Sequence, residues 1–158
     1  MRWILIYIRS LNKGYDVKKA VKYAKKYALT RNKEYTDFSN NGGDCTNFIS
    51  QCLDKGGLPY TNTWKPYSNA WLRVNELYYY IINNNIGYDV TKNKSYKLGD
   101  IVQFYSKYKG FFSHSGIITG ITINEDYLYS CHSSDKLNYP LEYAFPIVYD
   151  KIRVIRIG

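Results

Sequence analysis

Cys45 is the residue of this chain best placed for nucleophilic chemistry. It follows Gly42, Gly43 and Asp44 and begins an apolar pattern at helical spacing, so we expect it in the first turn of a helix. Unsatisfied backbone N–H groups and the positive end of the helix dipole stabilise a thiolate at such a position. The same N–H groups can hold the negative oxygen of a tetrahedral intermediate, and the glycine pair lets a substrate backbone approach closely.

The competing interpretation of any cysteine is a small buried hydrophobic residue. Cys52 lies on the same apolar stripe, seven residues after Cys45, and fits that interpretation. The chain has three cysteines, an odd number, and their spacing does not support a Cys52–Cys131 disulfide. Position at a helix start therefore singles out Cys45.

Two histidines are present, and each lies at the end of a predicted strand. His114 opens one strand and His132 closes the next, and a turn near Asn124 would place the strands side by side. We expect this pairing to bring the two rings together. A thiol nucleophile needs a base, and the base needs a group that orients its ring. We predict Cys45 as nucleophile, His114 as base and His132 as the orienting residue.

A zinc site built from Cys45, His114, Cys131 and His132 is the alternative, because cysteine and histidine are common zinc ligands. Structural zinc sites take paired ligands from short spacings such as C-x2-C, and the chain has none. Adjacent residues such as Cys131 and His132 would also point to opposite faces of a strand. We therefore expect no metal and no other cofactor.

The elements that must position these residues follow from the apolar spacing. Spacing of three and four predicts helices over 16–32, 44–55 and 68–83. Asp16 can cap the first helix, and Gly56 can end the second. The pattern then changes to that of strands, at about 100–105, 113–123, 127–132 and 152–157. Helices followed by strands predict an α+β fold, with N-terminal helices packed on an antiparallel sheet.

A chain of 158 residues, 45% of them hydrophobic, fits one compact domain over 1–158. The apolar run Trp3 to Ile8 is too short for a secretory signal or a membrane span. We expect it to form a strand or extension within residues 1–15, and we expect a monomer without a transmembrane segment.

The net charge of +9 would concentrate polyanions near the surface. An anionic cell wall or membrane is a candidate partner. The sequence shows no zinc-finger, RRM or basic-zipper pattern, so we expect no nucleic acid as partner. The chain also has 19 tyrosines, which suit clefts for polar polymers. The codon bias of an AT-rich genome explains the same abundance equally well.

The segment Asp44-Cys45-Thr46-Asn47-Phe48 and its flanks resemble the putative amidase domain family of bacterial proteins. That family is related to the NlpC/P60 and CHAP peptidases of the papain-like group. The segments 98–104, 113–118 and 131–133 agree with the resemblance. It implies a papain-like α+β core that cleaves amide bonds, with peptidoglycan stem peptides as the usual substrate class.

Carried over by position, the resemblance implies Cys45 as nucleophile, His114 as base and His132 as polar orienter. Asp44 matches a residue that holds the substrate amine, and Tyr35 loosely matches a tyrosine near the nucleophile.

The chain departs from papain at the oxyanion hole. Ser39 stands where papain has a glutamine, so an oxyanion hole here would depend on the backbone N–H of Cys45. Gln51 belongs to the family block, and its place in the helix indicates a structural hydrogen bond.

We therefore expect a cysteine-dependent amide hydrolase of a bacterium, secreted or associated with the cell wall. Accumulation in the cytoplasm before release is compatible with the sequence. The alternatives are a toxin that deamidates or cleaves a protein, a catalytically inactive wall-binding module, and an acyl or amide transferase.

Overall fold

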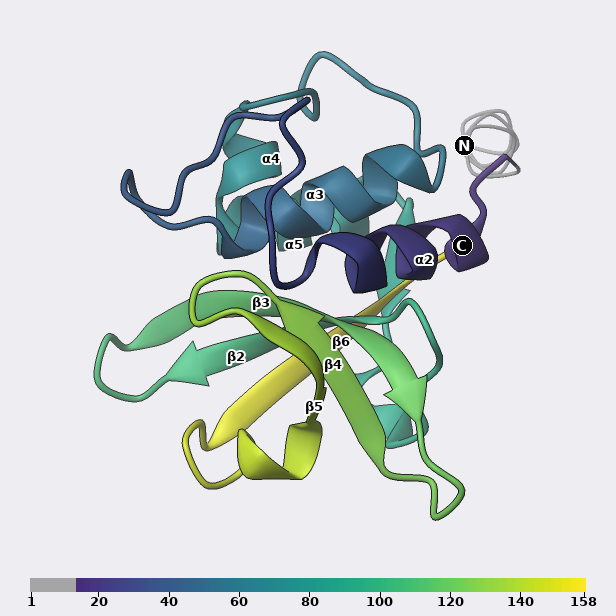
Figure 1. Ribbon diagram of the computed structural model, residues 1–158, viewed down its shortest axis with the longest axis vertical. Helices are drawn as coiled ribbons and strands as arrows, with labels where there is room; N and C mark the ends of the chain where they lie inside the picture. The colour runs from purple at the N-terminus through teal and green to yellow at the C-terminus, as the bar shows by residue number, and fades with distance from the viewer. Residues whose placement is uncertain (1–13) are drawn as a thin grey trace.

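The computed structural model describes residues 14–158, and the strand predicted at Trp3 to Ile8 lies outside them. The helices form one layer and a six-stranded sheet forms the second, as Figure 1 shows. An α+β architecture with an antiparallel sheet is therefore confirmed. No helix within the described range is long and apolar enough to cross a membrane.

Helix α2 (Val17–Tyr27) begins where the sequence predicts and ends earlier. The carboxylate of Asp16 accepts hydrogen bonds from the backbone N–H groups of Lys18 and Lys19, as an N-cap does. At the other end, the carbonyl oxygen of Tyr27 binds the ring of His132. Continuation of the helix would require that carbonyl to accept from residue 31 instead, which gives a physical reason for the early end.

Helix α3 (Cys45–Lys55) has the predicted bounds and ends at Gly56. The predicted third helix is two helices, α4 (Asn69–Leu72) and α5 (Val74–Asn83). Arg73 separates them because its backbone is extended, with φ −113° and ψ 134°. Apolar spacing continues across this break, so the sequence pattern could not reveal it.

The sheet contains the four predicted strands and two short ones that the sequence pattern missed. Its spatial order is β1-β6-β2-β3-β4-β5, and every neighbouring pair is antiparallel. The strands are β1 (Gly87–Asp89), β2 (Ile101–Ser106), β3 (Phe111–Ile121), β4 (Tyr127–Cys131), β5 (Lys136–Pro140) and β6 (Lys151–Ile157). The missed strands, β1 and β5, are short and mostly exposed edge strands, so they lack a clear apolar alternation.

Each face of the sheet has its own hydrophobic core. Ile101, Ile117 and Ile155 pack under the helices. Their chain neighbours point to the opposite face, here called the far face, because side chains alternate along a strand. The far-face core includes Val102, Ile118, Val154, Tyr129 and Cys131. Two short 3-10 helices, η1 (Thr91–Asn93) and η2 (Leu141–Tyr143), lie at the ends of strands, and Leu141 of η2 joins this core.

Strand β3 connects the two layers at the place where α3 begins. Its ladder with β4 starts only at Ile117, which pairs with Ser130. The earlier part of β3 pairs with β2 alone, so its other edge lies outside the ladder. The N-terminal turn of α3 lies against this part of β3, through a contact between Thr46 and Ser115.

Candidate active site

Cys45 is the first residue of α3, as the sequence predicts, and its side chain is half-buried. The N-cap residue Asp44 makes no side-chain cap with the helix. The first-turn N–H groups are therefore not consumed by the usual capping carboxylate. Cys45, Cys52 and Cys131 all carry free thiols.

Cys45 opens on a cleft of about 630 Å³. The walls come from the loop around Phe38 and Gly42, the α4–α5 junction at 72–76, and residues 109–113 at the start of β3. Arg73, Lys109 and Glu76 are exposed in this cleft and form no ion pair within residues 14–158. The cleft can therefore admit an extended polar substrate and offers it free charges of both signs.

The surroundings of the Cys45 thiol favour its neutral form. Burial raises the pKa of the thiol above its ordinary value, and the charge of Asp44 raises it further. Hydrogen bonds from the Thr46 hydroxyl, and from the backbone N–H groups of Ser115 and Thr46, act in the opposite direction. Burial prevails, so the resting group is a thiol beside donors that can receive negative charge.

Ser115 is a component of the site that the sequence analysis missed. Its Oγ lies 3.2 Å from Oγ1 of Thr46, and both side chains are buried. This contact fixes the start of α3 against β3. The Ser115 N–H is among the groups that lower the pKa of the Cys45 thiol. A backbone donor leaves no signature in residue type, so only its position next to His114 could have indicated it.

His114 precedes Ser115 and points to the far face of the sheet. Its ring packs beside two aromatic rings that also contact each other, with centroid distances of 5.5 Å to Phe104 and 6.2 Å to Tyr149. Burial, with smaller contributions from the charges of Lys136 and Lys109, lowers the pKa of His114 to about 4. The imidazole is therefore neutral at physiological pH, which is the form that can accept a proton.

The ring of His132 binds Asp44 and Tyr27, and not His114 as the sequence analysis expects. Its Nδ1 lies 2.5 Å from Oδ2 of Asp44, and its Nε2 lies 2.7 Å from the carbonyl oxygen of Tyr27. The ring also stacks on Phe48 at a centroid distance of 4.0 Å. Both ring nitrogens are thus occupied in the helix layer, and neither contacts His114. The expected direct orientation of His114 by His132 does not occur.

The strand register explains why the two histidine rings do not meet. Ile117 pairs with Ser130. The ladder ends at this pair, and His132 lies beyond it, in the turn that follows β4. His132 binds Asp44 and Tyr27 on the helix side, whereas His114 packs against Phe104 on the far face. The two rings therefore lie on opposite sides of the sheet.

Asp44 is fully buried, which differs from its expected role at the substrate amine. Its Oδ1 accepts hydrogen bonds from the Phe38 N–H and from Nδ2 of Asn47, both at 2.8 Å. Its Oδ2 contacts His132 and lies 3.7 Å from Nε of Arg31. These partners occupy the carboxylate, so it holds the loop before α3 and does not face the cleft.

Tyr35 also lies away from the candidate nucleophile. Its hydroxyl donates to Oδ2 of Asp54 at 2.5 Å, near the end of α3. Asp54 follows Cys45 by nine residues, which is about 14 Å along a helix. The expected position of Tyr35 near the nucleophile is therefore wrong for this chain.

Two smaller expectations about α3 are confirmed. Gln51 accepts a hydrogen bond from the Tyr23 hydroxyl at 2.6 Å, which joins α2 to α3. Cys52 is completely buried in the core under the helices.

Comparison with known proteins identifies the family. The family model described as "Putative amidase domain" matches residues 14–156. The chain belongs to this family. Membership places it among amidase-type hydrolases, and the match covers the cleft, Cys45 and both histidines.

The chain is also similar to two proteins of Bacillus subtilis (strain 168). It is 38% identical over 142 residues to "Uncharacterized protein YjcM", across 84% of this chain and 34% of YjcM. It is 33% identical over 117 residues to "Uncharacterized protein YhbB", across 66% of this chain and 37% of YhbB. The amidase domain thus spans about a third of these relatives. No solved structure matches it.

Proposed function

We propose that this amidase domain hydrolyses amide bonds through a thioester on Cys45, with His114 as general base. One observation carries the proposal. The Cys45 thiol lies at the start of α3 on the wall of an open cleft, and the next residue, Thr46, contacts Ser115, the chain neighbour of His114. The helix start and the cleft therefore meet at one sulfur, and this contact holds the part of β3 that carries His114 against the start of α3.

The protonation states define the first step. A neutral thiol and a neutral imidazole can react together if His114 takes the proton as the sulfur attacks the substrate carbonyl. The carbonyl oxygen becomes negative, and N–H groups at the start of α3 and at Ser115 stabilise it. The His114 imidazolium then donates its proton to the leaving amine as the C–N bond breaks.

The second half of the reaction releases the acyl group. Neutral His114 takes a proton from water, and the resulting hydroxide attacks the thioester carbonyl. The C–S bond breaks, the carboxylic acid leaves, and the proton returns from His114 to the sulfur. No cofactor is required for this cycle.

His132 acts as a positioning residue in this mechanism. It binds Asp44, which directly precedes Cys45, and so fixes the point at which α3 begins. In this mechanism the rings of Phe104 and Tyr149 orient His114, a role that the sequence analysis assigned to His132.

The proposed substrate is the peptide part of peptidoglycan, cleaved by a core related to the papain-like NlpC/P60 and CHAP enzymes. The charge of +9 supports residence on an anionic wall polymer. Arg73 and Lys109 line the cleft, and Tyr108 at the neighbouring β2–β3 turn is 99% exposed. A secreted or wall-associated protein would meet such a polymer.

Digestion of purified bacterial cell walls tests the proposal. We expect the wild-type domain to release fragments whose masses identify one cleaved amide bond, and Cys45→Ala to release none. Cys52→Ala is the matched control, because it removes a thiol that lies in the core and not in the cleft. Fragment release by folded Cys45→Ala protein would refute cysteine catalysis.

A further inference from the structure

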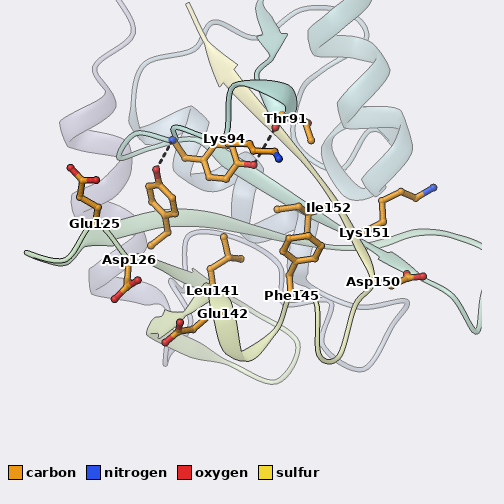
Figure 2. A pocket seen from close by; sticks show the side chains of 12 residues that line it. Thr91, Lys94, Glu125, Asp126, Leu141, Glu142, Phe145, Asp150, Lys151 and Ile152 are labelled. Carbon is orange, nitrogen blue, oxygen red and sulfur yellow. Dashed lines mark hydrogen bonds between the residues drawn. The ribbon is translucent and has the colours of Figure 1, made fainter.

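A second hollow, of about 620 Å³, lies on the far face of the sheet and shares no lining residue with the Cys45 cleft. Three separate segments frame it: η1 and the residues after it, the β3–β4 turn, and the stretch from η2 to the start of β6. Its floor is apolar, and Leu141, Phe145 and Ile152 lie at its centre in Figure 2.

The edge of this hollow is acidic. Glu125 and Asp126 lie on one side of it, Asp150 lies on the other, and Glu142 lies beside the floor (Figure 2). Lys94, which also lines the hollow, forms no ion pair with any residue of 14–158. The Lys151 side chain points away, and its ammonium lies 4.1 Å from the ring centroid of Tyr105. The local charge is thus negative in a chain whose net charge is +9.

Most of the carboxylates that hold no hydrogen bond or ion pair lie around this hollow. All 13 acidic residues lie within the described chain, and eight of them hold a hydrogen bond or an ion pair through the carboxylate. The five carboxylates that hold neither are Glu76, Glu125, Asp126, Glu142 and Asp150. Four of these five line the far-face hollow.

The spacing of the carboxylates argues against a single metal ion as the occupant. No group of three or more acidic, histidine or cysteine side chains in residues 14–158 is close enough to hold one. Separated negative charges around an apolar floor instead match a ligand with several separated positive charges and an apolar part. A peptide segment that alternates basic and apolar residues has this chemistry.

The segments that frame the hollow also expose apolar side chains. Ile147 and Val148, which follow η2, are 76% and 68% exposed, and Ile123 of the β3–β4 turn is fully exposed. Exposed apolar groups beside a charged rim are typical of protein-binding surfaces. The apolar contact area therefore extends beyond the hollow itself.

We propose that the far-face hollow binds a basic, amphipathic polypeptide segment. Apolar side chains of the segment occupy the floor at Leu141, Phe145 and Ile152, and its lysines or arginines face Glu125, Asp126, Glu142 and Asp150. The hollow shares no lining residue with the Cys45 cleft, so we expect binding to leave that cleft open. This surface is independent of the proposed hydrolysis.

Fluorescence anisotropy with labelled synthetic peptides tests this proposal. The probe is a heptapeptide of lysine alternating with leucine and phenylalanine, and two matched peptides replace the apolar residues by serine or the lysines by glutamate. We expect the full chain to bind the first peptide. It should bind each of the other two peptides at least about tenfold more weakly.

Variants then locate the binding site. The fourfold variant Glu125→Gln, Asp126→Asn, Glu142→Gln and Asp150→Asn should lose at least about tenfold in affinity. Single variants provide the matched comparison: Glu142→Gln should weaken binding, and Glu76→Gln, which removes the one free carboxylate of the other cleft, should not. Thermal melting checks that each variant is folded.

Unchanged affinity in the folded fourfold variant would overturn the proposal. Equal binding of the serine-containing peptide would also overturn it, because it would indicate attraction of any polycation without use of the floor. A bound peptide should leave the rate of Cys45 alkylation by iodoacetamide unchanged, and strong protection of Cys45 would place the peptide in the other cleft.

Discussion

Oδ2 of Asp44 lies 2.5 Å from Nδ1 of His132, although 88 residues separate them in the chain. This contact ties the end of β4 to the residue before the candidate nucleophile. Tyr27 holds the other nitrogen of the ring, so the start of α3 is fixed from α2 and from the sheet. We infer that the position of Cys45 depends on this pair.

Loss of either member of the pair should destabilise the domain. Breaking a buried pair leaves an unsatisfied polar group, so His132→Ala and Asp44→Asn should each lower the free energy of unfolding by about 3 kcal/mol. Urea denaturation measures both values and the double variant. A double-mutant cycle should give a coupling of about 1 kcal/mol or more. Simple additivity would show that the two residues act independently.

The environment of His114 predicts a pH dependence of stability. Its pKa falls from 6.5 to about 4 in the folded state, so between these values the unfolded chain binds a proton that the native protein does not. Stability should therefore decrease as the pH falls from 6.5 to 4, by up to about 3 kcal/mol from this residue.

His114→Phe isolates this contribution, because it keeps a ring packed against Phe104 and Tyr149 and cannot titrate. Urea unfolding at several pH values should give a flatter stability curve for the variant than for the wild type. Parallel curves over the same range would contradict the lowered pKa of His114.

The donors around Cys45 predict how its reactivity responds to substitution. The Thr46 hydroxyl lowers the pKa of the thiol, so Thr46→Val should raise that pKa further. The rate of iodoacetamide labelling should then reach half its maximum at a higher pH. Thr119→Val is the matched control, because it removes a buried hydroxyl that bonds Ser130 elsewhere in the sheet. An equal shift in both variants would mean that the Thr46 hydroxyl has no specific effect.

The catalytic position of His114 should depend on the aromatic ring of Tyr149 and not on the Tyr149 hydroxyl. The Tyr149 ring is nearly parallel to that of His114, at an interplanar angle of 11°. Tyr149→Ala should reduce fragment release from cell walls by about 10- to 100-fold, since a misplaced base is costly. Tyr149→Phe keeps the ring and should retain most of the activity. Comparable losses in both variants would instead assign the role to the hydroxyl.

The sequence was sufficient to predict the layers of the fold and the position of Cys45 at a helix start. Helical spacing after a glycine pair places Cys45 at a helix start, and runs of β-branched and aromatic residues mark strands β2, β3, β4 and β6. These patterns depend on residues that are close together in the sequence, so they can be recognised without knowledge of the tertiary structure. The break at Arg73 and the edge strands β1 and β5 depend on packing, and local pattern did not predict them.

The site was less predictable, because it depends on strand register and on backbone groups. Adjacent strands were expected to bring His114 and His132 together, but their ladder ends at Ile117 and Ser130, and the two rings contact opposite faces of the sheet. The sequence analysis expects Asp44 to face the substrate, whereas the structure buries its carboxylate. The contribution of Ser115 is a main-chain N–H, which residue type does not encode.

Mass spectrometry of the intact domain during turnover tests the central claim most directly. Wild-type protein quenched in acid while it digests purified cell walls should carry an acyl adduct that maps to Cys45 and is removed by hydroxylamine, as a thioester is. His114→Ala should form little adduct, and Cys45→Ala none. Continued fragment release by Cys45→Ala, or an adduct that maps to another residue, would contradict the assignment of Cys45 as the nucleophile.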